Sequence, residues 1–171
     1  MTPNPLKPRI VFVAKFGVAL VVLYAIVALN PVNDHVIVPF TAFVAHCTAL
    51  MLSTFESGVV SVGTVIQSPR FALDVRNGCN GVEATLLLVA AILGFPASLR
   101  SRLIGLGVAS IAIELLNLVR LCSLFLLGEH DRKIFDFVHV AVWQSLIILA
   151  AIAIFVLWSI KFAEKPLVKS R

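Results

Sequence analysis

Long apolar stretches alternate with short polar and charged segments along the chain. Four of them come close to the roughly 20 residues that a helix needs to cross a bilayer, namely 10–29, 81–97, 103–127 and 137–160. The 81–97 stretch is the shortest and needs its glycine and proline flanks to reach that length. This pattern predicts an all-α polytopic membrane protein with about four transmembrane helices, folded as a single integral membrane domain over residues 1–171.

The region between the first two stretches, residues 31–80, is predicted to lie at the outer face of the membrane. Within it, residues 36–56 form an apolar segment that is interrupted by Pro39, His46 and several hydroxyl side chains. Such a segment is amphipathic and is expected to lie as a helix in the membrane interface. The alternative is a five-span arrangement in which this segment also crosses the bilayer.

A different pattern follows from Ser57 to Asn77. Here β-branched and polar residues alternate around the sequence Gln67-Ser68-Pro69. Alternation with a proline-containing break is typical of two short strands joined by a turn. We therefore predict a small extracytoplasmic β-hairpin.

Composition and charge support a membrane location and predict an orientation. Of the residues, 60% are hydrophobic and 13% are charged, fewer charges than the roughly 25% usual in soluble domains. The net charge of +5 does not indicate nucleic acid binding, because nine of the 14 Lys and Arg residues flank apolar stretches. Basic flanks face the cytoplasm, which predicts a multi-pass protein of the cell inner (plasma) membrane with both termini cytoplasmic. The nine are Lys7, Arg9, Lys15, Arg100, Arg102, Lys161, Lys165, Lys169 and Arg171.

The first apolar stretch also has the order of a secretory signal, with basic residues before an apolar run. Its length and the absence of a small-residue cleavage pattern before Asn30 favour a retained span.

Three chemically active residues are predicted to meet in the outer third of the bilayer. An ionisable side chain inside a span costs a few kcal/mol, about 2.5–3.5 on insertion scales, and is a functional candidate by default. With a rise of about 1.5 Å per residue, Arg120 lies roughly 10 Å below the outer end of its span, and His139 lies about 3 Å below the outer end of the next. Cys79 belongs to the turn NGCNG, which leads into the second span.

This grouping is suited to nucleophilic catalysis. A neighbouring cation and an imidazole favour the thiolate form of Cys79, which is the attacking species. Gly78 and Gly81 allow close approach of the backbone, and amides at a helix N-terminus stabilise an anion. Arg120 can stabilise an oxyanion, and His139 can accept and return a proton.

Supporting roles are predicted for Glu83, Asn117 and Asp136. Glu83 follows Cys79 by four residues, Asn117 precedes Arg120 by three and can orient its guanidinium, and Asp136 precedes His139 by three. Two structural alternatives stay open: Arg120 pairs with Glu83 or Glu114, and His139 bonds to Asp136 or to the backbone. Cys47 and Cys122 are interpreted as small hydrophobic residues. Single cysteines without a CxxC pair predict neither a metal site nor a cofactor.

Three segments together resemble the exosortase/archaeosortase family of membrane cysteine transpeptidases, in particular its short exosortase H-type branch. They are NGCNGVEATLLLVAAILGFP at 77–96, NLVRL at 117–121 and FVHVAVWQ at 137–144. In that family a Cys begins one span, an Arg lies late in the next, and a His lies early in the last. The chain departs from the pattern at Asn80, where many members have Ser.

The resemblance implies a processing enzyme at the extracytoplasmic face. Its partners would be exported proteins with a C-terminal sorting signal, made of a short motif, an apolar helix and a basic tail, together with membrane lipid and an unidentified acceptor nucleophile. Cys79 would form the thioester. One alternative is a non-catalytic membrane assembly subunit with a buried Arg/Glu/His cluster. Another is an intramembrane phosphatase or acyltransferase, which needs several His and Arg residues or a His-Asp pair at the outer face, where this chain offers only Asp136 and His139.

Overall fold

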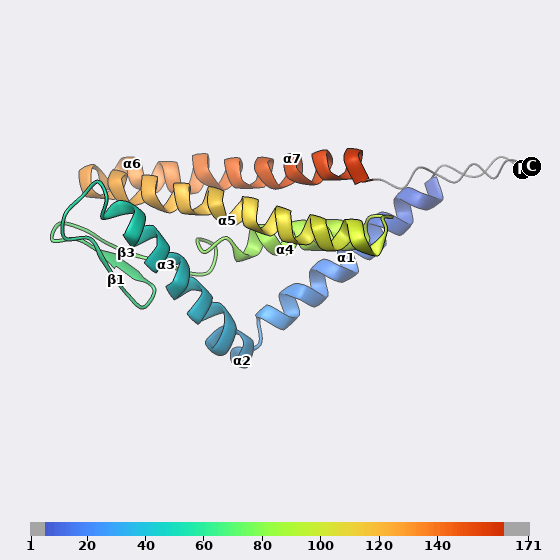
Figure 1. Cartoon of the computed structure of the whole chain (residues 1–171), viewed down its shortest axis with the longest axis horizontal. Helices are drawn as coiled ribbons and strands as arrows, with labels where there is room; N and C mark the ends of the chain where they lie inside the picture. The colour runs from blue at the N-terminus through green and yellow to red at the C-terminus, as the bar shows by residue number, and fades with distance from the viewer. Residues whose placement is uncertain (1–5, 163–171) are drawn as a thin grey trace, which may run out of the picture.

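Two long antiparallel helices form the centre of the fold. The structure is a computed structural model that describes residues 6–162. One long helix is α5 (Leu99–His130), and the other runs without a break through α6 (Arg132–Phe137), the π-helical η2 (Val138–Trp143) and α7 (Gln144–Phe162) (Figure 1). Asp131 joins them and caps α6 by accepting hydrogen bonds from the backbone of Lys133 and Ile134.

The N-terminal half forms a V beside this pair. Helix α1 (Leu6–Val27) is one arm, and α2 (Asn30–Val32), the π-helical η1 (Asn33–Ile37) and α3 (Val38–Leu52) form the other (Figure 1). Pro31 begins this second arm at a position where a helix has no need of the missing N–H. The shorter α4 (Val82–Gly94) fills the space between α1, α5 and α7.

By length and composition, four helical segments could cross a membrane: Pro8–Val27, Asn30–Leu52, Leu99–His130 and Arg132–Lys161. These four segments are not the same four that the sequence predicts as spans. The stretch 81–97 is a helix of only 13 residues, because Pro96 and an extended Phe95 end it early. The segment expected to lie in the interface is part of a 23-residue apolar helix.

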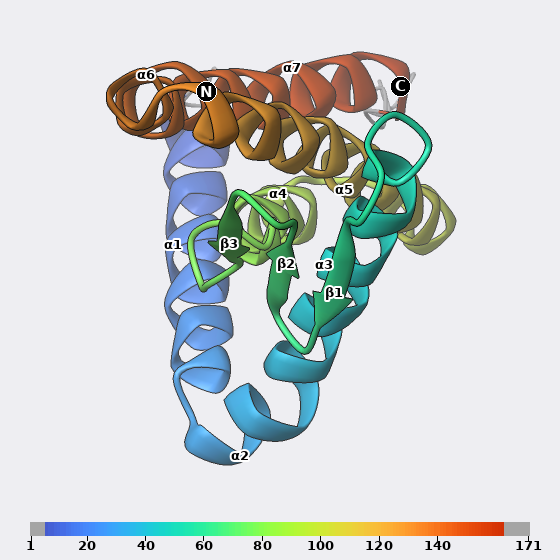
Figure 2. The ribbon, with the colours of Figure 1, turned by 90° about the vertical axis from the view of Figure 1, so that its left-hand side faces the viewer.

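The region predicted as a hairpin contains three strands with two turns. They are β1 (Val60–Val62), β2 (Val65–Gln67) and β3 (Ala72–Asp74), paired antiparallel in the order β1-β2-β3. Gly63 has a φ of +58°, which lets the chain reverse tightly between β1 and β2. Figure 2 shows this sheet at one end of the helices, with α3 beside β1.

Two cores stabilise the arrangement. The first packs the sheet against α3 and α5, with Ile66, Leu52 and Phe125 fully or almost fully buried. The second packs α4 against α5 and α7 and includes Ile92 and Ile113, both 0% exposed. The first core reaches Cys79 in the turn that precedes α4, and the second begins at Ala84, within the first turn of α4.

The two ends of the molecule differ in charge. The start of α1, the α4–α5 connection and the end of α7 lie at one end (Figure 1); this basic end carries Arg9, Arg100, Arg102 and Lys161. The sheet and α6 lie at the opposite end, which we call the sheet end.

Candidate active site

The turn before α4 presents Cys79 between two glycines with left-handed backbone. Gly78 has a φ of +89° and Gly81 a φ of +83°, a conformation that L side chains rarely adopt. The Cys79 amide donates to the carbonyl of Arg76 at 2.8 Å, which closes the turn. The sequence NGCNG thus folds as a tight double bend whose apex carries the thiol.

Asn80 fastens this turn to both neighbouring helices. Its side chain is 0% exposed, and its Oδ1 accepts from the amide of Val82 at 3.2 Å, which satisfies a free N–H at the start of α4. Its Nδ2 donates to Thr41 Oγ1 on α3 at 2.9 Å and to Asn77 Oδ1 at 3.2 Å. The residue that departs from the family pattern is therefore a structural anchor of the turn.

The structure brings Cys79, His139 and Arg120 together from three different elements. The Sγ atom of Cys79 lies 2.9 Å from His139 Nε2 on η2, and Arg120 Nη2 on α5 lies 3.8 Å from the same sulfur. The thiol is within direct proton-transfer reach of the imidazole. A guanidinium edge lies on another side of the sulfur.

Arg120 is buried without an ionic partner. It is 2% exposed, its Nη1 donates to the carbonyl of Gly78 at 3.4 Å, and its Nε has no hydrogen bond among the described residues. Within residues 6–162, neither Glu83 nor Glu114 forms an ion pair with it, and the ion pairs found are Arg70–Glu56 and Arg76–Asp74. The alternative in which a direct ion pair holds Arg120 is absent from the structure.

Electrostatics at the thiol favour the protonated resting form. Burial raises the pKa of the Cys79 thiol above its usual value; the positive charge of Arg120 acts in the opposite direction, and the carboxylate of Glu83 adds to the rise. Ionisation of this thiol therefore needs a base, and His139 Nε2 is in hydrogen-bond contact with it.

The predicted supporting residues take different positions. Glu83 accepts a hydrogen bond from the backbone amide of Gly78 at 2.7 Å and so stabilises the turn. Asp136 makes no hydrogen bond to His139 in the structure. Instead the imidazole packs on the ring of Phe135, with centroids 5.7 Å apart and an interplanar angle of 29°.

Asn117 is fully buried on the face of α5 that carries Arg120, but no hydrogen bond joins the two. It lies next to Glu114, whose Oε1 accepts from Thr85 Oγ1 at 3.2 Å. The Glu114 carboxylate occupies the place that a Cβ at Gly81 would need. The structure shows no hydrogen bond by which Asn117 would orient Arg120, and α5 contacts the start of α4 through Glu114.

A sequence model of the transmembrane exosortase family matches residues 6–159, which is most of the chain. The chain belongs to the transmembrane exosortase family. Members of this family are membrane proteins and generally cysteine transpeptidases that process exported proteins carrying a sorting signal. No curated protein and no solved structure matches the chain.

Sequence reasoning missed three residues around the site of this exosortase-family chain. Phe135 stands four residues before His139, a spacing that places two side chains on one helical face and offered a usable signal. Thr41 lies 39 residues from its partner Asn80, and no local pattern links the two. Glu114 was considered only as a partner of Arg120, and its contacts with Thr85 and Gly81 at the start of α4 were not predicted.

Within residues 6–162, no group of three His, Cys, Asp or Glu side chains is placed to hold a metal ion. The side chains in contact with the Cys79 sulfur are one imidazole and one guanidinium, and a guanidinium suits an acyl group with a developing negative charge.

Proposed function

We propose that this chain is a sorting transpeptidase that cleaves a C-terminal sorting signal through a thioester on Cys79. The observation that carries the proposal is the 2.9 Å approach of Cys79 Sγ to His139 Nε2, with Arg120 Nη2 at 3.8 Å from the same sulfur. The family membership supports the reaction class, and the site residues are assigned here from geometry.

In the first half-reaction, the Cys79 proton moves to His139 Nε2 as the sulfur attacks the carbonyl carbon of the scissile peptide bond. The carbonyl oxygen becomes negatively charged, and Arg120 donates hydrogen bonds to it. Collapse of this intermediate breaks the C–N bond, and His139 returns its proton to the leaving amine. The products are a thioester on Cys79 and the released C-terminal tail with a new amino terminus.

In the second half-reaction, an acceptor nucleophile attacks the thioester carbonyl. His139 takes the proton of this nucleophile and gives it to the departing sulfur, which regenerates the thiol. Transfer to an acceptor and hydrolysis by water follow the same steps, so the chemistry of the acceptor decides the product.

The proposal places the basic end in the cytoplasm and the sheet end outside. The clustering of Arg9, Arg100, Arg102 and Lys161 at one end supports this orientation, since loops rich in Lys and Arg stay cytoplasmic. Both termini would then be cytoplasmic in the inner membrane, and Cys79 would be reached from the extracytoplasmic side.

Replacement of Cys79 by Ala in the native cell tests the function, with Cys122→Ala as a matched control because Cys122 is also partly buried but lies outside the site. We expect exported proteins with a C-terminal apolar helix and basic tail to accumulate uncut only in the Cys79→Ala strain. Membrane levels of both variants should equal the wild type. If the Cys79→Ala strain processes them at the normal rate, the cysteine mechanism is wrong and a non-catalytic assembly role gains support.

A further inference from the structure

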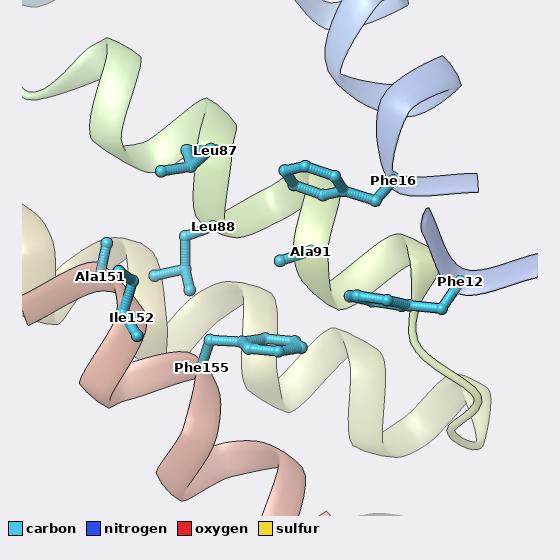
Figure 3. A pocket seen from close by; sticks show the side chains of 8 residues that line it. All are labelled: Phe12, Phe16, Leu87, Leu88, Ala91, Ala151, Ile152 and Phe155. Atoms are coloured by element: carbon cyan, nitrogen blue, oxygen red, sulfur yellow. The ribbon is translucent and has the colours of Figure 1, made fainter. Parts of the chain in front are cut away.

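An apolar groove runs along α4 between α1 and α7. It has a volume of about 300 Å³, and Figure 3 shows phenylalanine rings from α1 and α7 on its walls and α4 side chains at its base. The residues used below are Phe12, Phe16, Leu87, Ala91, Ile152 and Phe155. No polar side chain lines it.

The groove is closed at the basic end of the molecule. Phe12 stacks on Phe155 with ring centroids 6.0 Å apart, and Phe95 meets both rings edge-on at 6.1 and 5.7 Å. These three rings form a plug, so an occupant can extend only sideways into the lipid or toward the sheet end.

Toward the sheet end, the groove adjoins a smaller cavity beside the site, which has polar as well as apolar lining residues. This cavity has a volume of about 160 Å³, and Leu87 lines both spaces. Gly78, Glu83 and Arg120 line the cavity on the side of the site, and Gln144 lines it from α7. Two other apolar grooves, between α3 and α5 and between α5 and α7, share no lining residue with this cavity.

An occupant that fills both spaces has a polar segment next to Arg120 followed by an apolar segment along α4. A lipid acyl chain fits the groove, but the acyl chain carries no polar group that could pair with the guanidinium, the amide and the carboxylate that line the cavity. A peptide that enters a membrane helix just after its scissile bond has both parts. Ala84 and Ala91 on α4 also allow the close backbone approach that favours helix pairing in lipid.

We propose that the groove between α1, α4 and α7 docks the first turns of the substrate's own membrane helix, and that the cavity receives the peptide segment ahead of it. This inference rests on the proposed function. From Ala84 to Ala91 the contact covers eight residues of α4, over roughly 10 Å, which is about two turns of the substrate helix. Ahead of the Phe12–Phe155 plug, the substrate helix leaves the groove sideways and continues in lipid.

Filling the groove tests the proposal, and Ala91→Trp is the first variant. Ala153→Trp is its control, because Ala153 lies on α7 with its side chain exposed and lines neither space. In a background with Cys47→Ala and Cys122→Ala, the alkylation rate of Cys79 by a small thiol reagent reports whether the site is intact. We expect Ala91→Trp to lower processing of the anchored precursor at least 10-fold with unchanged Cys79 alkylation, and Ala153→Trp to behave as the wild type.

A photocrosslinking experiment tests the same contact without filling the groove, and it is needed if Ala91→Trp disturbs the fold. A benzophenone amino acid replaces Phe16 in the Cys79→Ala protein, and a second protein carries it at the exposed Leu149 as control. Capture of the uncut precursor from position 16 and not from 149 supports docking. Capture of lipid alone from position 16, or normal processing by Ala91→Trp, overturns it. A different result, normal processing by Cys79→Ala, would overturn the proposed function itself.

Discussion

The hydrogen bond from Asn80 to Thr41 can be removed with a matched internal control. Thr41 and Thr48 are both buried on α3, at 3% and 0% exposed, and each donates its hydroxyl to the carbonyl four residues earlier at 2.8 Å. Only Thr41 also accepts from Asn80 Nδ2, at 2.9 Å. Thr41→Val and Thr48→Val therefore make the same change in shape and lose the same helical bond, and they differ only at the turn.

The expected difference in processing rate between Thr41→Val and Thr48→Val follows from the hydrogen bonds of the Asn80 side chain. Its Nδ2 has two hydrogens and two partners, so loss of the Thr41 oxygen leaves one N–H buried without a partner. Such a group costs about 1–3 kcal/mol. If the whole of this free energy disfavours the conformation in which Cys79 contacts His139, the processing rate falls by about 5- to 150-fold. Thr48→Val should change the rate by less than about 2-fold, because it touches nothing in the turn.

The measurement is the rate at which membranes carrying each variant process an anchored precursor, normalised to the amount of variant protein. Thermal unfolding of both proteins in detergent serves as the control for general destabilisation. Equal rates for Thr41→Val and Thr48→Val would refute the idea that α3 holds the nucleophile turn, whatever the absolute values are.

Three further predictions concern the site. Because Arg120 lowers and Glu83 raises the pKa of Cys79, Arg120→Gln should move the pH midpoint of Cys79 alkylation upward and Glu83→Gln should move it downward. A shift of the two midpoints in the same direction would contradict this. Gly78→Ala should cost about 1–2 kcal/mol of stability from its positive φ alone, and Gly81→Ala should cost more, because its Cβ also meets a carboxylate from α5; thermal unfolding measures both. Arg120→Met should abolish processing without lowering the unfolding temperature.

The three reactive residues could be named from the sequence because a membrane span makes each polar residue conspicuous. Their contact was harder to predict, since the span boundaries placed His139 several ångströms closer to the surface than Arg120. In the structure the last helix begins at Arg132 instead of residue 137, which puts His139 roughly 10 Å into its helix. Arg120 lies ten residues before the end of α5, or roughly 15 Å, so the difference in depth falls from roughly 7 Å in the sequence estimate to roughly 5 Å in the structure.

The elements that hold the turn could not be read from local patterns. Residues 36–56 were judged by their polar content, but Thr41 and Thr48 return their hydroxyls to the helix backbone, which removes much of the cost of placing them in an apolar helix. The single predicted turn around Pro69 missed the reversal at Gly63, because three-residue strands are too short to show alternation. Contacts such as Asn80 with Thr41 depend on how the helices pack and have no signature within either segment.

The surroundings of Arg120 give an active site and a structural scaffold different expected responses to its removal. A guanidinium has five N–H donors, yet in the described structure Arg120 makes one long bond to a carbonyl and one to sulfur, and its Nε has no partner. In a structural ion-pair cluster, removal of the cation leaves buried carboxylates unpaired and costs about 3–5 kcal/mol. Here no ion pair is lost, and removal of an unpaired buried charge is neutral or stabilising. The assembly role therefore predicts a loss of stability for Arg120→Met and the catalytic role predicts none, so a clear fall in its unfolding temperature would favour the assembly subunit over the transpeptidase.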